Sequence, residues 1–208
     1  MDSNREHLNN LSEIRQLMER SSSFLSLSGL SGISAGVIGI ITTVILDYKL
    51  GAFLSYQKDV SLTAERRTGF IVFCVILFTA VLAVTFGAAI YFTTRKAKKK
   101  GLPIWGPAAR NLTQNLFVPL IAGGIFCIIL VYNYFDFLVL PSMLVFYGLA
   151  LINAGKFTFG ELKWLGISEI LIGLAALLLL DNVLWFWGLG FGVMNIVYGA
   201  VMYFRYER

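Results

Sequence analysis

Long apolar runs alternate with short polar or charged segments along almost the whole chain. Six apolar segments stand out, at about residues 28–47, 68–92, 113–133, 137–155, 164–181 and 183–204. A helix needs ~20 apolar residues to cross the ~30 Å hydrocarbon core of a bilayer, and most of these segments meet that length. Because unpaired backbone groups cannot face lipid, each run is expected to be helical. The pattern predicts an all-α, polytopic membrane bundle of six transmembrane helices, forming one domain over residues 28–208.

Residues 1–27 have a different pattern, in which Leu11, Ile14, Met18 and Leu25 alternate with charged side chains. This spacing predicts an amphipathic helix that lies on the cytoplasmic membrane surface and leads into the first span. The same positions follow an a/d pattern, which would instead suit dimerisation or binding of a partner. Since the a/d pattern is short, the surface helix is the preferred interpretation, and both alternatives stay open.

Composition and charge agree with a membrane protein and set its orientation. The chain is 57% hydrophobic and 14% charged, whereas soluble domains are typically ~25% charged. Of the 17 Lys and Arg residues, four fall on one side of the drawn spans: Lys49, Lys58, Arg66 and Arg67. The other thirteen fall on the side of the two termini. Because basic residues favour the cytoplasmic side, both termini are expected there, in a plasma membrane of the bacterial inner-membrane type.

One dense basic run accounts for much of the net charge of +5. It follows the second apolar segment directly and contains Arg95, Lys96, Lys98, Lys99 and Lys100. This is the expected place for a topology signal and for contact with anionic lipid head groups. Membrane lipids are therefore the expected partners, and nucleic acid is not.

An internal repeat emerges when the chain is compared with itself. Residues 32–47 align without gaps on residues 166–181, with seven of sixteen positions identical. The second, fourth and sixth segments share an aromatic residue followed by glycine: Phe86-Gly87, Tyr147-Gly148 and Tyr198-Gly199. The repeat predicts three helical hairpins in the same orientation. The first would differ by a longer, polar outer loop, residues 48–67.

Glycines lie on one face in two of the segments. These are Gly29, Gly32, Gly36 and Gly39 in the first, and Gly188, Gly192 and Gly199, with Asn195 among them, in the last. In lipid, helices associate through close backbone approach and interhelical hydrogen bonds, because there is little hydrophobic drive between them. These faces are expected to be packing seams, and a homo-oligomer through them is a further prediction.

Residues 164–205 contain Leu165-Gly166-Ile167-Ser168, Ile172-Gly173, Trp187-Gly188-Leu189-Gly190 and Tyr198-Gly199. With these motifs the segment resembles the short repeat of HdeD-type acid-resistance membrane proteins. The resemblance implies a six-span protein built from two-helix repeats, and it implies a role in stress. The N-terminal segment and the long first outer loop depart from that family's pattern.

Glu169 is the one acidic residue well inside an apolar run, and such residues mark candidate functional sites. A turn at Asp181-Asn182 places Asn195 opposite Glu169, so a hydrogen bond between them is expected. Asn153 and Lys156, at the inner end of the fourth segment, are expected to complete a small polar cluster. Burial of Glu169 favours its neutral form. The site is interpreted either as a proton- or ligand-responsive centre or as interhelical polar contact without further function.

No catalytic set can be assembled from these residues. Gly32-Ile33-Ser34-Ala35-Gly36 matches the G-x-S-x-G pattern of serine hydrolases, but that pattern requires a strand–turn–helix elbow and a histidine base. Here it lies within an expected helix, and His7 is the single histidine of the chain. No cofactor or metal is expected. The sequence therefore favours a non-enzymatic multi-pass membrane protein with a stress-related or regulatory role. The alternative is a small transporter or channel for a proton, a lipid-like molecule or a small neutral solute.

Overall fold

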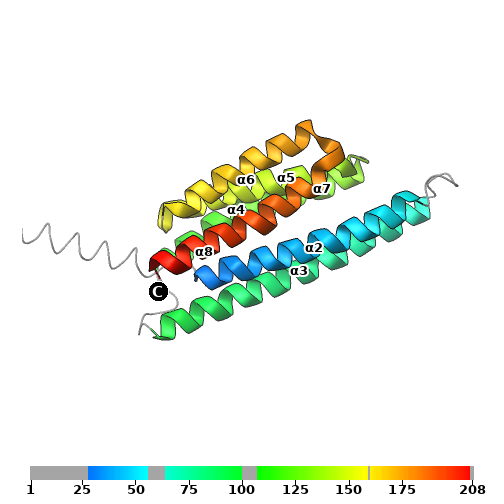
Figure 1. Cartoon of the computed structure of the whole chain (residues 1–208). Coiled ribbons are helices and arrows are strands. Elements are labelled where there is room, and N and C mark those ends of the chain that lie inside the picture. The colour runs from blue at the N-terminus through cyan, green and yellow to red at the C-terminus, as the bar shows by residue number, and fades with distance from the viewer. Residues whose placement is uncertain (1–27, 56–63, 100–106, 159, 207–208) are drawn as a thin grey trace, which may run out of the picture.

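The computed structural model describes residues 28–55, 64–99, 107–158 and 160–206. Within these ranges the chain consists of helices and short turns, without strands, and the helices lie side by side as one bundle (Figure 1). Five helical stretches are long and apolar enough to cross a membrane: Gly29–Gly51, Glu65–Lys99, Ala109–Tyr132, Asp136–Phe157 and Leu180–Tyr206. The expected all-α fold is thus confirmed for the described residues, with five helical stretches that could span a membrane. The amphipathic segment expected within residues 1–27, and Lys100, lie outside the described residues.

The first hairpin is formed by α2 (Gly29–Ser55) and α3 (Ala64–Lys99). The outer loop expected at residues 48–67 is shorter in the structure, because α2 continues to Ser55 and α3 begins at Ala64. A helix satisfies its own backbone hydrogen bonds, so it need not end where the apolar run ends. The 36 residues of α3 extend ~54 Å at 1.5 Å per residue. Its charged ends therefore project well beyond a ~30 Å hydrocarbon core.

The middle of the chain forms α4 (Pro107–Tyr132), a 3-10 turn η2 (Asp136–Leu138), α5 (Val139–Ala154) and a second 3-10 turn η3 (Gly155–Phe157). Pro119 lies inside α4. Proline has no N–H, so the carbonyl of Asn115, one turn earlier, loses its helical partner. The side chain of Asn153 on α5 replaces it, with Nδ2 donating to Asn115 O at 3.2 Å. The proline and the asparagine together set how α4 and α5 face each other.

The last hairpin consists of α6 (Glu161–Leu178), a 3-10 turn η4 (Leu180–Asn182), α7 (Val183–Trp187), η5 (Gly188–Met194) and α8 (Asn195–Tyr206). The expected sixth span corresponds to α7, η5 and α8 in succession. The seven residues of η5 form a π-helix, which the sequence did not predict. Three glycines in alternation, Gly188, Gly190 and Gly192, place little side-chain constraint on this segment.

Two pairs of helices pack with their backbones almost in contact. A Cβ atom added to Gly32 would lie 2.9 Å from Gly199 Cα, which joins α2 to α8. A Cβ added to Gly166 would lie 2.7 Å from Gly148 O, which joins α6 to α5 in the same way. The two glycine faces that were expected to be packing seams, on α2 and on the last segment, are confirmed, because they pack on each other. Helices of the same chain cover these faces in the described structure, and a homo-oligomer through them stays a prediction.

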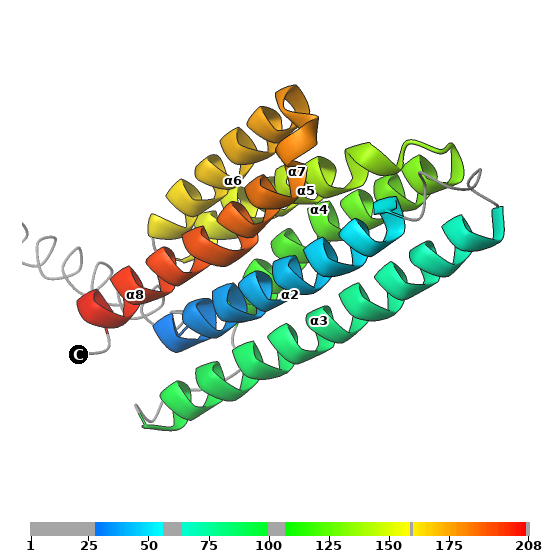
Figure 2. The same ribbon diagram turned by 45° about the vertical axis from the view of Figure 1, so that its right-hand side comes forward.

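In the bundle, α2 lies between α3 and α8, and α5 lies between α4 and α6. Figures 1 and 2 place α3 at one edge, beside α2, and α6 near the other. Large apolar side chains are exposed on every long helix, as expected for surfaces that face lipid. Arg67, in the first turn of α3, ties that end of the helix to the turn after α4. Its guanidinium donates to both oxygens of Asp136 at 2.9 Å and to Val131 O at 2.7 Å.

The opposite end of the bundle is strongly basic. The start of α2 and the end of α8 meet there, as do the end of α5 and the starts of α4 and α6 (Figure 1). The basic side chains at this end are Arg95, Lys96, Lys98, Lys99, Arg110, Lys156, Lys163 and Arg205. Among the described residues there, the acidic one is Glu161, which pairs with Arg205 at 2.8 Å. The charge asymmetry seen in the sequence thus persists in the folded bundle.

Candidate functional site

Glu169 lies halfway along α6 and is fully buried, with 0% of its surface exposed. The helix can carry it because its side chain points into the bundle, where it meets α5 and η5. Gly190 of η5 makes room for it, since an added Cβ there would fall on Glu169 Oε2 and 2.5 Å from Leu144 Cδ2. The carboxyl group is therefore held in a space shaped by the absence of a side chain at Gly190.

Asn195, the first residue of α8, is 4% exposed and faces Glu169. Its Nδ2 lies 3.4 Å from Glu169 Oε1 and 3.3 Å from both Gly190 O and Phe191 O. An amide nitrogen has two hydrogens, so three acceptors compete for them, and all three distances are long for hydrogen bonds. The expected pairing of Glu169 with Asn195 is confirmed. It also connects the carboxyl group to carbonyls of the π-helix.

Tyr147 of α5 completes a short polar chain, because its hydroxyl donates to Asn195 Oδ1 at 2.9 Å. Its ring stacks on Phe191 with centroids 4.8 Å apart, and Phe191 packs on Trp187 at the same distance. Phe78 of α3 meets Trp187 edge-on at 5.8 Å. A row of packed aromatic rings, from Tyr147 on α5 to Phe78 on α3, therefore borders the hydrogen-bonded chain.

Two buried polar atoms of this region have no hydrogen-bond partner among the described residues: Glu169 Oε2 and Trp187 Nε1. Leaving a buried polar atom unpaired costs ~1–3 kcal/mol. Such atoms are rare in folded proteins and mark places of strain or function. π-helical segments are also frequent at functional sites. The two features coincide here, which makes Glu169 and its surroundings the candidate site.

Asn153 and Lys156 do not join Glu169 in the described structure. Lys156 Nζ donates to Asn153 Oδ1 at 3.1 Å, and Asn153 in turn donates to Asn115 O on α4. The single polar cluster expected from the sequence is therefore two clusters. The reason is that α5 turns Asn153 towards α4, whereas Tyr147 on the same helix faces α8.

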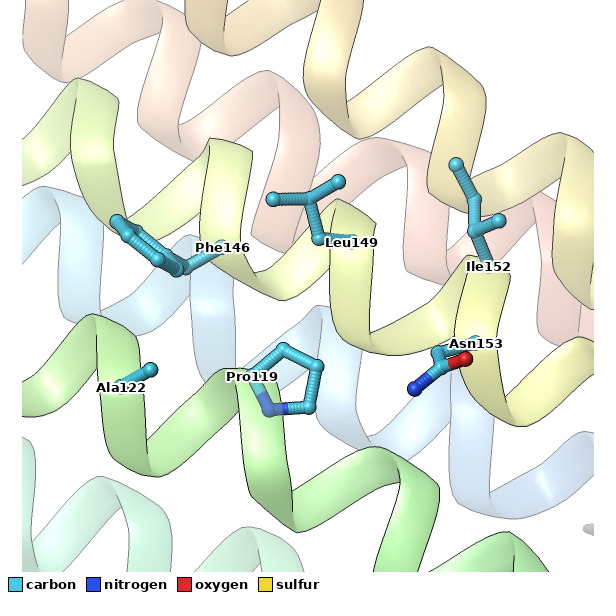
Figure 3. A pocket seen from close by; sticks show the side chains of 6 residues that line it. All are labelled: Pro119, Ala122, Phe146, Leu149, Ile152 and Asn153. Atoms are coloured by element: carbon cyan, nitrogen blue, oxygen red, sulfur yellow. The ribbon is translucent and has the colours of Figure 1, made fainter.

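A shallow groove borders the second cluster, between α4 and α5. It is lined by Pro119, Ala122, Phe146, Leu149, Ile152 and Asn153, with a volume of about 430 Å³. Figure 3 shows Asn153 beside Pro119 at one end of the groove and Phe146 with Ala122 at the other. Apart from Asn153 its lining is apolar.

Two further groups of residues singled out in the sequence have clear positions. Arg95, Lys96, Lys98 and Lys99 form the last turns of α3 at the basic end of the bundle. Ser34, of the G-x-S-x-G pattern, lies inside α2, where its hydroxyl donates to Ser31 O at 2.9 Å. The pattern is thus part of a continuous helix and not the strained elbow that a hydrolase needs.

The sequence did not single out Tyr147, Trp187 or Gly190 as parts of the site. Tyr147 was noted for the glycine after it, and its hydrogen bond depends on how α5 is rotated against α8. The alternating glycines of Gly188-Leu189-Gly190-Phe191-Gly192, seven residues or fewer before Asn195, were the available signal for an irregular helix.

No protein-family model matches the chain, and no match is found among curated proteins or among solved structures.

Proposed function

We propose that the chain crosses a membrane six times, as three like-oriented hairpins, with both termini on the cytoplasmic side of a bacterial inner membrane. The crossing added to the five apolar helical stretches is α6, the fifth in chain order, whose 18 residues extend ~27 Å at 1.5 Å per residue. It differs from them in carrying three charged residues within its 18: Glu161, Lys163 and Glu169. The first two lie in its first turn at the basic end, and Glu169 is buried within the bundle. Lipid therefore meets none of these charges at mid-membrane depth.

The hairpin repeat is supported by the two glycine contacts. Gly32 and Gly166 are aligned positions of the repeat, and each packs on the glycine that follows a tyrosine, Gly199 and Gly148 respectively. Equivalent residues thus make equivalent contacts in two places. The third such glycine, Gly87 of α3, has no heavy atom within 4 Å of an added Cβ among the described residues.

Cysteine labelling tests the topology. In a variant whose own Cys74 and Cys127 are replaced by alanine, single cysteines at Asp181 and at Lys163 are treated with a membrane-impermeant maleimide. In intact cells we expect labelling at position 181 and none at position 163, because the proposed crossing of α6 separates them. Labelling of both positions from the same side would contradict this crossing.

We further propose that the protein is not an enzyme and acts in a regulatory or stress-related role, with Glu169 as its proton-responsive group. The observation that supports this best is the buried carboxyl with one unpartnered oxygen, linked through Asn195 to a π-helical segment. A carboxylate in apolar surroundings is far more costly than the neutral acid. Gain or loss of one proton therefore changes the balance of hydrogen bonds at Asn195. The resemblance of residues 164–205 to HdeD-type proteins supports a role in acid stress.

Fluorescence of Trp187 tests this role, because its ring packs on Phe191 inside the π-helix. The other three tryptophans, Trp105, Trp164 and Trp185, are replaced by phenylalanine, and emission is followed across mildly acidic to mildly alkaline pH in lipid nanodiscs. We expect a transition with the native Glu169 that is lost in Glu169→Gln, which keeps the shape of the neutral acid but cannot titrate.

Asp181→Asn is the matched control, since Asp181 is exposed in the turn before α7. It should leave the transition unchanged. The same pH dependence in Glu169→Gln as in the parent protein would exclude Glu169 as the responsive group.

Transport of a proton or a small neutral solute is the second candidate function. It is favoured by the hydrogen-bonded chain from Glu169 through Asn195 to Tyr147, since such chains carry protons in membrane proteins. Proteoliposomes that contain a pH-sensitive dye measure it directly. Proton movement that is present in the native protein and absent in Glu169→Gln would favour transport. Equal leakage in protein-free liposomes would count against it.

A further inference from the structure

The groove between α4 and α5 is a concave surface of the bundle that the proposed function does not use. Its walls are Pro119 and Ala122 on one side and Phe146, Leu149 and Ile152 on the other. The ring of Pro119 takes the place of a backbone N–H and forms part of the α4 wall of the groove. The space left between the helices is apolar.

A polar boundary marks one end of this groove. Asn153 lies there, one residue before the end of α5, and Lys156 is bonded to it at 3.1 Å. Leu149 and Asn153 lie on one face of α5, and Lys156 follows in the 3-10 turn η3, so the apolar wall continues directly into a positive charge. A molecule that fits both parts has an apolar tail and a negatively charged head.

Both polar side chains keep hydrogen-bonding capacity for such a head group. Asn153 Nδ2 has two hydrogens and uses one on Asn115 O, and the Lys156 ammonium has three and uses one on Asn153 Oδ1. The remaining donors suit an ester carbonyl and a phosphate oxygen. They lie in the order in which a glycerophospholipid presents these groups from its tail outward.

The sign of the surrounding charge agrees with an anionic lipid. Lys156 lies at the basic end of the bundle, where Glu161, the acidic residue among the described ones there, is already paired with Arg205. Nearby basic residues therefore add to the attraction for a negative head group and do not cancel it.

We propose that the α4–α5 groove binds one acyl chain of an anionic glycerophospholipid, with its phosphate at Lys156 and its ester region at Asn153. The lipid belongs to the leaflet at the basic end of the bundle. This site is separate from Glu169, so it does not depend on the proposed role of that residue.

Native mass spectrometry of the full chain released from detergent tests the proposal. Retention of phosphatidylglycerol is compared with retention of phosphatidylcholine that has the same acyl chains. We expect one retained lipid, with phosphatidylglycerol bound about fivefold more tightly, which corresponds to the ~1 kcal/mol that one lysine contributes near an anionic head group.

Two substitutions separate the tail from the head group. Ala122→Phe fills the groove and should reduce retention of both lipids. Lys156→Gln should abolish the preference for phosphatidylglycerol and leave phosphatidylcholine retention unchanged. The matched controls are Ala83→Phe on α3 and Lys49→Gln on α2, both at exposed positions, which should behave as the native protein.

Native-like retention in Ala122→Phe would overturn the proposal. Equal loss in Lys156→Gln and Lys49→Gln would also overturn it, because it would indicate diffuse attraction to the positive charge of the protein. If Ala122→Phe fails to fold, Leu149→Phe fills the groove from the other wall and gives the same test.

Discussion

The contact between α2 and α8 makes a quantitative prediction for Gly199→Ala. A Cβ at position 199 would fall on Ile33 N, and it would lie 2.6 Å from Gly29 O and 2.8 Å from Gly32 C. All three are backbone atoms, so no side chain can rotate away. Since an ordinary carbon–oxygen contact is about 3.4 Å, the two helices must separate by at least about 0.8 Å. Overpacking of this kind costs ~1–3 kcal/mol.

Gly87→Ala is the matched control, because Gly87 also follows an aromatic residue in a helix of the same proposed direction. A Cβ at this position meets no heavy atom within 4 Å among the described residues. Alanine favours a helix over glycine by ~1 kcal/mol, and this gain applies to both variants. Gly87→Ala should therefore be neutral or slightly stabilising. Gly199→Ala should be less stable than Gly87→Ala by the full ~1–3 kcal/mol of overpacking.

Reversible unfolding in mixed micelles with increasing denaturing detergent measures both free energies of unfolding under one condition. Gly32→Ala, on the other side of the same contact, should lose stability in the same way, because its added Cβ would lie 2.9 Å from Gly199 Cα. Equal stability of Gly199→Ala and Gly87→Ala would refute the close approach of α2 and α8.

Three further predictions concern the candidate site and the outer end of the bundle. Gly190→Ala should destabilise the fold, because the added methyl group overlaps the Glu169 carboxyl group, and Glu169→Ala should relieve part of that loss. A double-mutant cycle should therefore give a coupling free energy of ~0.5–3 kcal/mol. Additive effects of the two substitutions would exclude the contact. Asn195→Leu should cost ~1–3 kcal/mol, because it leaves the Tyr147 hydroxyl and Glu169 Oε1 without their partner; an unchanged unfolding curve would contradict this. Arg67→Lys keeps the positive charge but cannot donate to both oxygens of Asp136 at once. Amide hydrogen exchange should therefore increase over the first turns of α3. An unchanged exchange pattern would argue against a stabilising role of the Arg67–Asp136 pair.

Part of the candidate site followed from the sequence. The turn at Asp181-Asn182 fixed which residues of the two helices of the last hairpin lie at the same distance from the turn. The contact of Glu169 with Asn195 could therefore be predicted by counting residues on each side of the turn. Tyr147 could not be, because the rotation of α5 against α8 depends on side-chain packing along both helices. Asn153 was assigned to the wrong neighbour for the same reason. Its depth was foreseeable, but its direction depends on the carbonyl that Pro119 leaves without a partner.

The sequence by itself determined the helical class and the distribution of charge between the two ends. Apolar runs in lipid must close their own backbone hydrogen bonds, and this requirement acts on each segment separately. It also indicated which helix faces carry glycine. The tertiary structure decided which faces meet: Gly32 on Gly199, Gly166 on Gly148, and Gly87 on none of the described residues. It also decided that the last helix passes through a π-helical segment beside Glu169. These outcomes depend on how residues distant in sequence compete for the same space, and no local pattern contains that information.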